Sequence, residues 1–321
     1  MKAVSQKIVD FHCDALSKMQ ELPDLVFLND HRLDVTAERM DAGGILLQTF
    51  AIYLSAHRGS PRFEDIIGQI DRFHTEVERV GGLQWLRWKE EAANLDNDSR
   101  KWGMLSLEGV EGLEGNLLYA QLIFELGVRF MGITWNYANW AADGVLERRN
   151  GGFTEKGRKL VEWCNASGML LDVSHLSEAG FWELAELSTR PFIASHSNAA
   201  AVCRHPRNLR DEQIRAIIEM DGLMGLTFYP WFVNESGEAG TGDLLKHLEH
   251  VCSLGGERHI MFGSDFDGID IKVKGLEHPG CYPEFAEQLL KHFPEEIVNG
   301  WLHGNAISYL VNHLPSHATK G

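Results

Sequence analysis

The sequence predicts an α/β fold in which eight parallel strands and their helices form a (β/α)8 barrel of the TIM type, as a single domain over residues 1–321. Eight short apolar segments alternate with amphipathic stretches along the chain, which is typical of such a barrel. No GxGxxG motif follows the first segment, although open nucleotide-binding sheets commonly carry one there. An open doubly wound sheet is the alternative, and the number of units favours the barrel.

The eight apolar segments are the predicted strands. Each is apolar on both faces, as strands are in a parallel sheet that is covered on both sides. The predicted strands are residues 7–14, 44–54, 103–109, 128–136, 168–175, 191–197, 222–229 and 259–268.

Amphipathic stretches between these segments predict helices. Several begin at a good capping residue, such as Thr154 or Ser177, and end at a glycine, such as Gly168. The clearest predicted helices are residues 117–127, 154–168, 177–187 and 210–222.

The composition excludes several classes of function. The chain has 30 Lys and Arg against 46 Asp and Glu, a formal net charge of −16. This acidity argues against binding to nucleic acids or to anionic membranes, which attract basic surfaces. No signal peptide or membrane-spanning segment is recognisable, and the five scattered cysteines include no CxxC pair. We therefore expect a cytoplasmic protein with reduced thiols.

Side chains that bind metals follow the apolar part of five predicted strands. The C-terminal strand ends of a barrel meet at the face that carries the chemistry. We therefore expect imidazoles and carboxylates to converge at one rim: His12 and Asp14 after the first strand, Glu108 after the third, His175 after the fifth, His196 after the sixth, and Asp265 and Asp267 after the eighth.

Three of these residues are histidines and indicate a metal site. His12 and Asp14 are two residues apart, so in a strand they face the same side and suit a Zn²⁺-like ion. One histidine after a strand is more often a core residue, but His175 and His196 follow neighbouring strands. Three imidazoles buried together without a cation would lack partners. We expect the other histidines at the surface, among them His57, His247, His250 and His292.

Glu108 is the candidate bridge between two cations, because a carboxylate has two oxygen atoms. The alternative is a carboxylate at a helix N-terminus, which fits Glu111 and Glu114 better. Many dinuclear barrel hydrolases bridge their metals with a carbamylated lysine, but no lysine lies at a predicted strand end here. The sequence therefore favours a glutamate bridge.

Two further residue types fit a hydrolytic site. Asp265 is the first polar residue after the eighth strand that could face the mouth, where it could move a proton from an activated water to a leaving amine. Asp267 fits a turn residue. Arg207, in a short loop after a proline, is the candidate clamp for a substrate carboxylate, whereas Arg204 fits a solvated surface residue equally well.

These motifs occur together in one known family. They are HCD at 12–14, LEG at 107–109, DVSH at 172–175, SHSN at 195–198, HPRN at 205–208 and SDFDG at 264–268. From about residue 7 to about residue 312, in order and spacing, the chain resembles the renal (membrane) dipeptidase family of zinc metallopeptidases. The resemblance implies a distorted barrel with two zinc ions, for which Mn²⁺ or Co²⁺ are substitutes.

The resemblance also implies a role for each site residue. It implies a dipeptidase that often accepts D-residues at the C-terminal position and acts by attack of a metal-bridging hydroxide. The implied roles are these: His12, Asp14 and Glu108 hold one ion, Glu108, His175 and His196 hold the other, Asp265 shuttles the proton, and Arg207 and Tyr229 bind substrate.

Two positions depart from the family pattern. Trp135 stands where the family commonly has a histidine that helps to hold the substrate carbonyl or the tetrahedral intermediate. Tryptophan has one N–H donor and cannot ionise. Trp135 is therefore a replacement donor or a wall of a reshaped pocket, and the nearby Tyr137 and Trp140 favour the wall. Ser308 replaces a usual arginine, which we interpret as a structural difference.

The prediction is a cytoplasmic dinuclear zinc dipeptidase whose partner is a small dipeptide, neither a nucleic acid nor a membrane; a homodimer is left open. One alternative is an amidase, a lactamase-like enzyme or a tailoring enzyme on the same metal site, because Trp135 replaces the family histidine. Another is a metal-binding protein without turnover. Asp265 and Arg207 argue against the latter, since metal storage requires neither residue.

Overall fold

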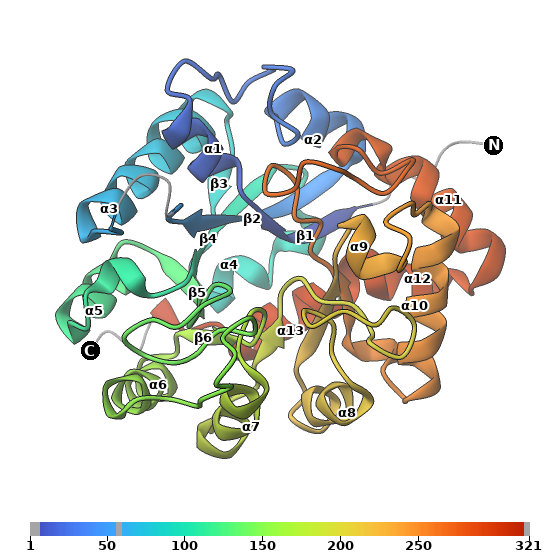
Figure 1. Ribbon diagram of the computed structural model, residues 1–321. Helices are drawn as coiled ribbons and strands as arrows, with labels where there is room; N and C mark the ends of the chain where they lie inside the picture. Colours follow the sequence, from blue (N-terminus) through green and yellow to red (C-terminus); the bar gives the residue numbers. More distant parts are fainter. Residues whose placement is uncertain (1–6, 56–59, 318–321) are drawn as a thin grey trace.

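Eight parallel strands form a closed barrel that helices surround (Figure 1). The computed structural model describes residues 7–55 and 60–317. The open-sheet alternative is excluded, because β1 pairs with β2 and β9, and β2 also pairs with β4. The barrel strands are β1 (Ile8–Cys13), β2 (Ile45–Tyr53), β4 (Trp102–Glu108), β5 (Val128–Gly132), β6 (Leu170–Asp172), β7 (Ile193–Ala194), β8 (Leu223–Leu226) and β9 (Ile260–Phe262).

All eight predicted strands are confirmed, and one short strand was not predicted. The additional strand, β3 (Gln84–Trp85), pairs with Trp102 and Gly103 at the beginning of β4. Strand β5 pairs with β4 only from Leu105 onwards. β3 thus pairs with the N-terminal end of β4 and is not one of the eight strands that close the barrel.

The four predicted helices are confirmed as α5, α6, α7 and α8. Thr154 and Ser177 cap α6 and α7 by accepting hydrogen bonds from the backbone of Gly157 and Gly180. The helices are α1 (Ala15–Glu21), α2 (Ala37–Gly43), α3 (Phe63–Arg72), α4 (Lys89–Ala92), α5 (Leu117–Glu125), α6 (Glu155–Ser167), α7 (Glu178–Leu187), α8 (Asp211–Glu219), α9 (Pro230–Val233), α10 (Thr241–Ser253), α11 (Tyr282–His292), α12 (Glu295–Asn299) and α13 (Asn305–His313). Of the helices in the described ranges, none has the length and apolar character required to cross a membrane.

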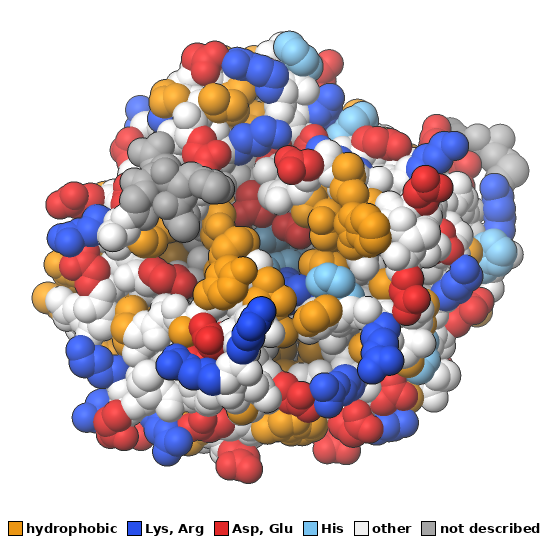
Figure 2. Space-filling model, in the orientation of Figure 1, with side chains coloured by type: hydrophobic (Ala, Val, Ile, Leu, Met, Phe, Trp, Pro, Cys, Tyr) orange, Lys and Arg blue, Asp and Glu red, His pale blue; other side chains and the backbone are white. Residues whose placement is uncertain are grey.

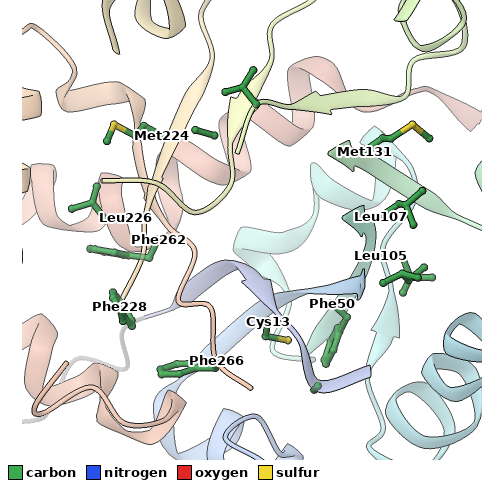
Figure 3. Packing of buried hydrophobic residues seen from close by; sticks show 14 of the residues in the cluster. Cys13, Phe50, Leu105, Leu107, Met131, Met224, Leu226, Phe228, Phe262 and Phe266 are labelled. Atoms are coloured by element: carbon green, nitrogen blue, oxygen red, sulfur yellow. The ribbon is translucent and has the colours of Figure 1, made fainter. Parts of the chain in front are cut away.

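Two apolar clusters hold the barrel together. The inner cluster joins strand residues such as Phe11, Met104 and Phe130 to Ile307 and Leu310 of α13. The outer cluster packs the strands against the surrounding helices, and Figure 3 shows part of it, including Phe50, Leu107, Met131, Leu226 and Phe262. Burial of these side chains is the main favourable term in folding.

A β-bulge in β1 changes which way its last residues point. Asp10 pairs with Gln48 and Cys13 pairs with Phe50, so β1 advances three residues where β2 advances two. One extra residue in a strand reverses the alternation of its side chains. Phe11 lies in the inner cluster and Cys13 in the outer one, and His12 between them is directed to the barrel mouth.

Asp10 links the two strands that flank the site, and it is fully buried. Its Oδ1 accepts hydrogen bonds from the backbone N–H of His12 (3.2 Å) and of Ser264 (2.9 Å), and its Oδ2 accepts one from the Tyr282 hydroxyl (3.0 Å). Burial raises the pKa of Asp10, and these donors act in the opposite direction. The carboxyl group thereby holds β1, the segment after β9 and α11 together.

Removal of the Tyr282 hydroxyl tests the charge on Asp10. Tyr282→Phe should lower the free energy of unfolding by about 2 kcal/mol, because a buried carboxylate loses a donor. Tyr309→Phe is the control, since its hydroxyl donates to the backbone carbonyl of Pro191 at 2.9 Å; here we expect about 1 kcal/mol. Urea unfolding measures both. Equal losses would mean that Asp10 is neutral in the folded protein.

Candidate metal centre

The structure brings five predicted ligands together at the barrel mouth. His12 Nε2 lies 3.4 Å from Asp14 Oδ2 and 3.7 Å from Glu108 Oε2. Glu108 Oε1 lies 2.8 Å from His175 Nε2 and 3.5 Å from His196 Nε2. Two groups of three candidate ligand atoms result, each within 4.8 Å, and both contain Glu108. The arrangement could hold two cations with one carboxylate between them.

The local backbone explains how these side chains converge. Glu108 ends β4, and His12 reaches the mouth through the β1 bulge. Asp14 lies beyond the strand as the N-cap of α1. The expectation that strand alternation brings His12 and Asp14 together is therefore wrong, although the two side chains do converge. His175 has a φ of 69°, a left-handed conformation that non-glycine residues rarely adopt and that functional sites often contain.

Several buried atoms at the centre fit a metal ion. His12 Nε2 and Asp14 Oδ1 are buried and have no hydrogen-bond partner within residues 7–55 and 60–317. The Nε2 atoms of His175 and His196 face each other at 2.8 Å, while both Nδ1 atoms have other partners, Asn136 Oδ1 and Ser195 Oγ. Imidazole nitrogen and carboxylate oxygen are ligands that Zn²⁺ binds, and cations between them would satisfy these atoms.

The ligand charges interact strongly because the site is buried. Burial acts to lower the pKa of His12, but Glu108 and Asp14 outweigh it and raise this pKa to about 10. Burial acts to raise the pKa of Glu108, but His12 and His175 lower it to about 2. Without cations, these shifts favour a protonated His12 and an ionised Glu108 that stabilise each other.

Asp265 lies beside this cluster, with Oδ1 3.7 Å from His12 Nε2. It also forms a third group of candidate ligands with His12 and His196. Burial raises its pKa to about 7, and Asp14 acts in the same direction. Its φ is 68°, so the chain turns sharply after β9 and directs this carboxyl group at the cluster.

Arg207 is buried next to the cluster, with 4% of its surface exposed. Its guanidinium donates to Ser197 Oγ at 3.4 Å and to the His196 carbonyl at 3.3 Å, and it lies over the Phe232 ring. Its Nε has no partner in the described part of the chain. Tyr229, half-buried at the start of α9, packs edge-on against Phe232. The Phe232 ring thus contacts both Tyr229 and Arg207.

A cavity of about 900 Å³ begins at His175, Ser197 and Arg207 and extends towards α7 and α8. Figure 2 shows a hollow at the centre of this face, with histidine and basic side chains within it and hydrophobic side chains around it. The buried guanidinium gives this hollow a fixed positive charge, which suits an anionic group of a small ligand.

Trp135 lies next to the cluster, in an aromatic group on the side of β2 and β5. Its ring centre is 6.2 Å from that of His175, 5.4 Å from that of Tyr53 and 6.3 Å from that of Tyr137. Tyr53 ends β2 opposite Glu108 of β4. The side chain of Trp135 thus packs among aromatic rings, as expected for a wall of the site.

Sequence reasoning missed several features of the site. Tyr53 lies near the end of the apolar segment 44–54, where the sequence does not distinguish it from a core residue. Asp267 is more than a turn residue, since its buried carboxylate accepts from the backbone of Asp34 and Val35 and pairs with Lys18 at 3.0 Å. Asp172 and Ser195, which lie behind His196, belong to the motifs DVSH and SHSN. Those motifs do not indicate a function for either residue.

The expectation of surface histidines was wrong for His247, which is fully buried. Its Nδ1 accepts from the backbone of Ala199 at 3.1 Å, and its Nε2 bonds to the Val233 carbonyl at 2.9 Å. His292 is exposed and His250, partly exposed, pairs with Asp211, whereas His57 lies outside the described residues. His247 of α10 thus links the segment after β7 to the end of α9.

Comparisons with known proteins agree with this geometry. The sequence pattern of the membrane dipeptidase family (Peptidase family M19) matches residues 3–312. An uncharacterized protein in the pqqA 5′ region of Klebsiella pneumoniae is 37% identical over 175 residues, which are 51% of this chain and 65% of that protein. The dipeptidase aclJ of Aspergillus oryzae is 35% identical over 191 residues, 58% of this chain and 45% of aclJ. The chain thus spans less than two thirds of the length of these curated relatives.

Solved structures are similar over almost the whole chain. The structure of dipeptidase AC, a metallopeptidase of family M19, has a TM-score of 0.90 and 28% identity, and the match covers 98% of this chain and 100% of that one. A metallopeptidase from Rhodobacter sphaeroides, solved with a phosphinate mimic of the dipeptide L-Ala-D-Ala, has a TM-score of 0.87 and 28% identity, with coverage of 96% and 99%. This chain therefore belongs to the membrane dipeptidase family, Peptidase family M19.

Proposed function

We propose that the protein is a dinuclear zinc dipeptidase that hydrolyses the peptide bond of small dipeptides. The observation that carries this proposal is the pair of ligand groups that share Glu108 next to the buried guanidinium of Arg207. One group is His12, Asp14 and Glu108, and the other is Glu108, His175 and His196. Zinc is proposed from the imidazole and carboxylate ligands, a set that Mn²⁺ and Co²⁺ also accept.

The residues around the cations have distinct roles in the proposed reaction. Ions held by the two ligand groups would activate a water as the nucleophile and would polarise the peptide carbonyl. Arg207 holds the free carboxylate of the dipeptide, which places the scissile bond one residue away. Asp265, beside His12, accepts a proton from the attacking water and returns it to the leaving amine.

One relative supports the chirality that we propose for the substrate. The Rhodobacter sphaeroides structure contains a mimic of L-Ala-D-Ala, and this chain matches that one over almost its full length. We include acceptance of a D-residue at the C-terminal position in the proposal. A single domain, a cytoplasmic location and a small dipeptide as partner, with neither a nucleic acid nor a membrane, complete it.

Trp135 favours one second candidate function. The ring packs against Tyr53 and Tyr137 beside His175, where relatives are expected to carry a histidine. A wall at this point changes which acyl groups fit. An amidase, a lactamase-like enzyme or a tailoring enzyme on the same metal site is therefore the alternative.

A panel of dipeptides with both chiralities at each position, and with free or amidated C-termini, tests the proposal. Amidation should lower kcat/KM by roughly 30-fold to 160-fold, which corresponds to about 2–3 kcal/mol of activation free energy, because Arg207 loses a charged acceptor. The Arg207→Lys variant should lose most of this preference, since Lys lacks the planar pair of donors. Equal rates on free and amidated dipeptides would remove Arg207 from this role, and no turnover on any dipeptide would favour the alternative enzyme.

Two carboxylate variants distinguish a ligand from a proton carrier. Glu108→Ala should lose at least one of two zinc ions, because both ligand groups contain Glu108. Asp265→Asn should keep both ions and lose most turnover, because an amide cannot accept the proton. Metal analysis of the purified variants measures this. Loss of zinc in Asp265→Asn would instead make Asp265 a ligand.

Two substitutions of Trp135 distinguish a wall from a donor. If the indole N–H stabilised the developing oxyanion, Trp135→Phe would cost on the order of 3 kcal/mol, about a hundredfold in rate. The aromatic packing favours the wall, so we expect Trp135→Phe to stay within about threefold of the wild type, roughly 0.6 kcal/mol. Trp135→His should mainly broaden the range of dipeptides. Steady-state kinetics on the same panel gives both results, and a hundredfold loss in Trp135→Phe would contradict the wall.

A further inference from the structure

Behind the ligand His196 lies a pair of buried polar residues that are not ligands themselves. Asp172 ends β6, and Ser195 directly follows β7. Both are almost fully buried, with 8% and 4% of their surfaces exposed. A buried carboxylate away from the cations requires hydrogen-bond donors. One of the donors here, Ser195, also contacts the candidate ligand His196.

The Asp172 carboxylate is surrounded by donors. Its Oδ1 accepts from the backbone N–H of Ser174 and of Ser195, both at 2.9 Å. Its Oδ2 accepts from the Ser195 hydroxyl in a short contact. The same hydroxyl oxygen lies 2.7 Å from His196 Nδ1. Asp172, Ser195 and the His196 ring therefore form one continuous chain of hydrogen bonds.

Which group donates in each of these hydrogen bonds determines which nitrogen of His196 can bind a cation. A hydroxyl has one hydrogen, and an ionised Asp172, which also accepts from two backbone N–H groups, can only accept that hydrogen from Ser195. The remaining contact then has His196 Nδ1–H as donor and Ser195 Oγ as acceptor. With its proton on Nδ1, the neutral ring has its lone pair on Nε2, the atom that faces Glu108 and His175.

We propose that Ser195 and Asp172 are positioning residues that hold His196 with its proton on Nδ1 and its Nε2 free to bind metal. The proposal rests on the dinuclear centre proposed above and adds a role for two residues outside the ligand set. Partners of this kind orient ligand histidines and increase their basicity, and their loss typically costs 10-fold to 100-fold in metal affinity.

Packing alone does not supply this control. The His196 ring lies 3.9 Å from the His12 ring and 4.9 Å from the His175 ring, centre to centre, and these contacts do not distinguish one tautomer from the other. His175 has a partner of its own, since its Nδ1 lies 2.9 Å from Asn136 Oδ1. The Ser195 hydroxyl is the group that contacts His196 Nδ1, whereas Nε2 faces the other candidate ligands.

The test is the zinc affinity of the full chain after its metals have been removed, measured by competition with a chromophoric chelator. Ser195→Ala should weaken the binding of one of two zinc ions by 10-fold to 100-fold. Asp172→Asn should weaken it at least as much, because the new amide donates to Ser195, which then donates to Nδ1 and moves the ring proton to Nε2. In the Co²⁺-loaded variants, the visible spectrum of the affected ion should change as well.

Ser174→Ala is the matched control, because Ser174 is also a buried hydroxyl that contacts His196, but at its backbone N–H (3.1 Å). Its zinc affinities should stay within about threefold of the wild type. The proposal is overturned if Ser195→Ala and Asp172→Asn bind both ions as tightly as the wild type, or if Ser174→Ala loses as much affinity as they do. A wild-type chain that binds no zinc would overturn the proposed function itself.

Discussion

The structure depends on one electrostatic constraint, the burial of many electron-pair donors around Glu108. Three imidazoles and two carboxylates reach one point from four different strands or the residues that follow them. Such atoms repel one another unless protons or cations lie between them. In the chain alone, a protonated His12 performs this role. The barrel provides the rigid frame, and the donors behind each ligand determine where a cation could lie.

The frame achieves this arrangement through local departures from regular structure. The β1 bulge directs His12, and His175 and Asp265 adopt left-handed backbones with φ near 70°. Each such residue costs about 1 kcal/mol or more. Fixed contacts offset this cost, because the His175 carbonyl accepts from Val145 at 2.7 Å and the Asp265 N–H donates to the His12 carbonyl at 3.2 Å.

The sequence was sufficient for the barrel and for the convergence of its ligands, because apolar strands and their polar ends are local patterns. It could not predict β3, which has two residues, or the bulge, which depends on pairing between β1 and β2. Contacts between distant segments were also hidden, such as those of Asp267 with residues 34 and 35 and the burial of His247. Asp10 is a polar residue inside an apolar strand, and two of its three donors, Ser264 and Tyr282, lie far away in the sequence, so no local pattern indicates its role.

Membership of a family and identity of function are separate conclusions here. The fold and the cluster around Glu108 match those expected for the family, whereas Trp135 stands where the family pattern commonly has a histidine. A ring among Tyr53, Tyr137 and His175 provides an aromatic surface beside the cluster, but it supplies no ionisable donor. In the proposed reaction, Arg207 and the cations would therefore hold the substrate without an ionisable group at position 135. The proposed substrate range therefore depends on the residues that line the site as well as on the metal ligands, since one fold can host several chemistries.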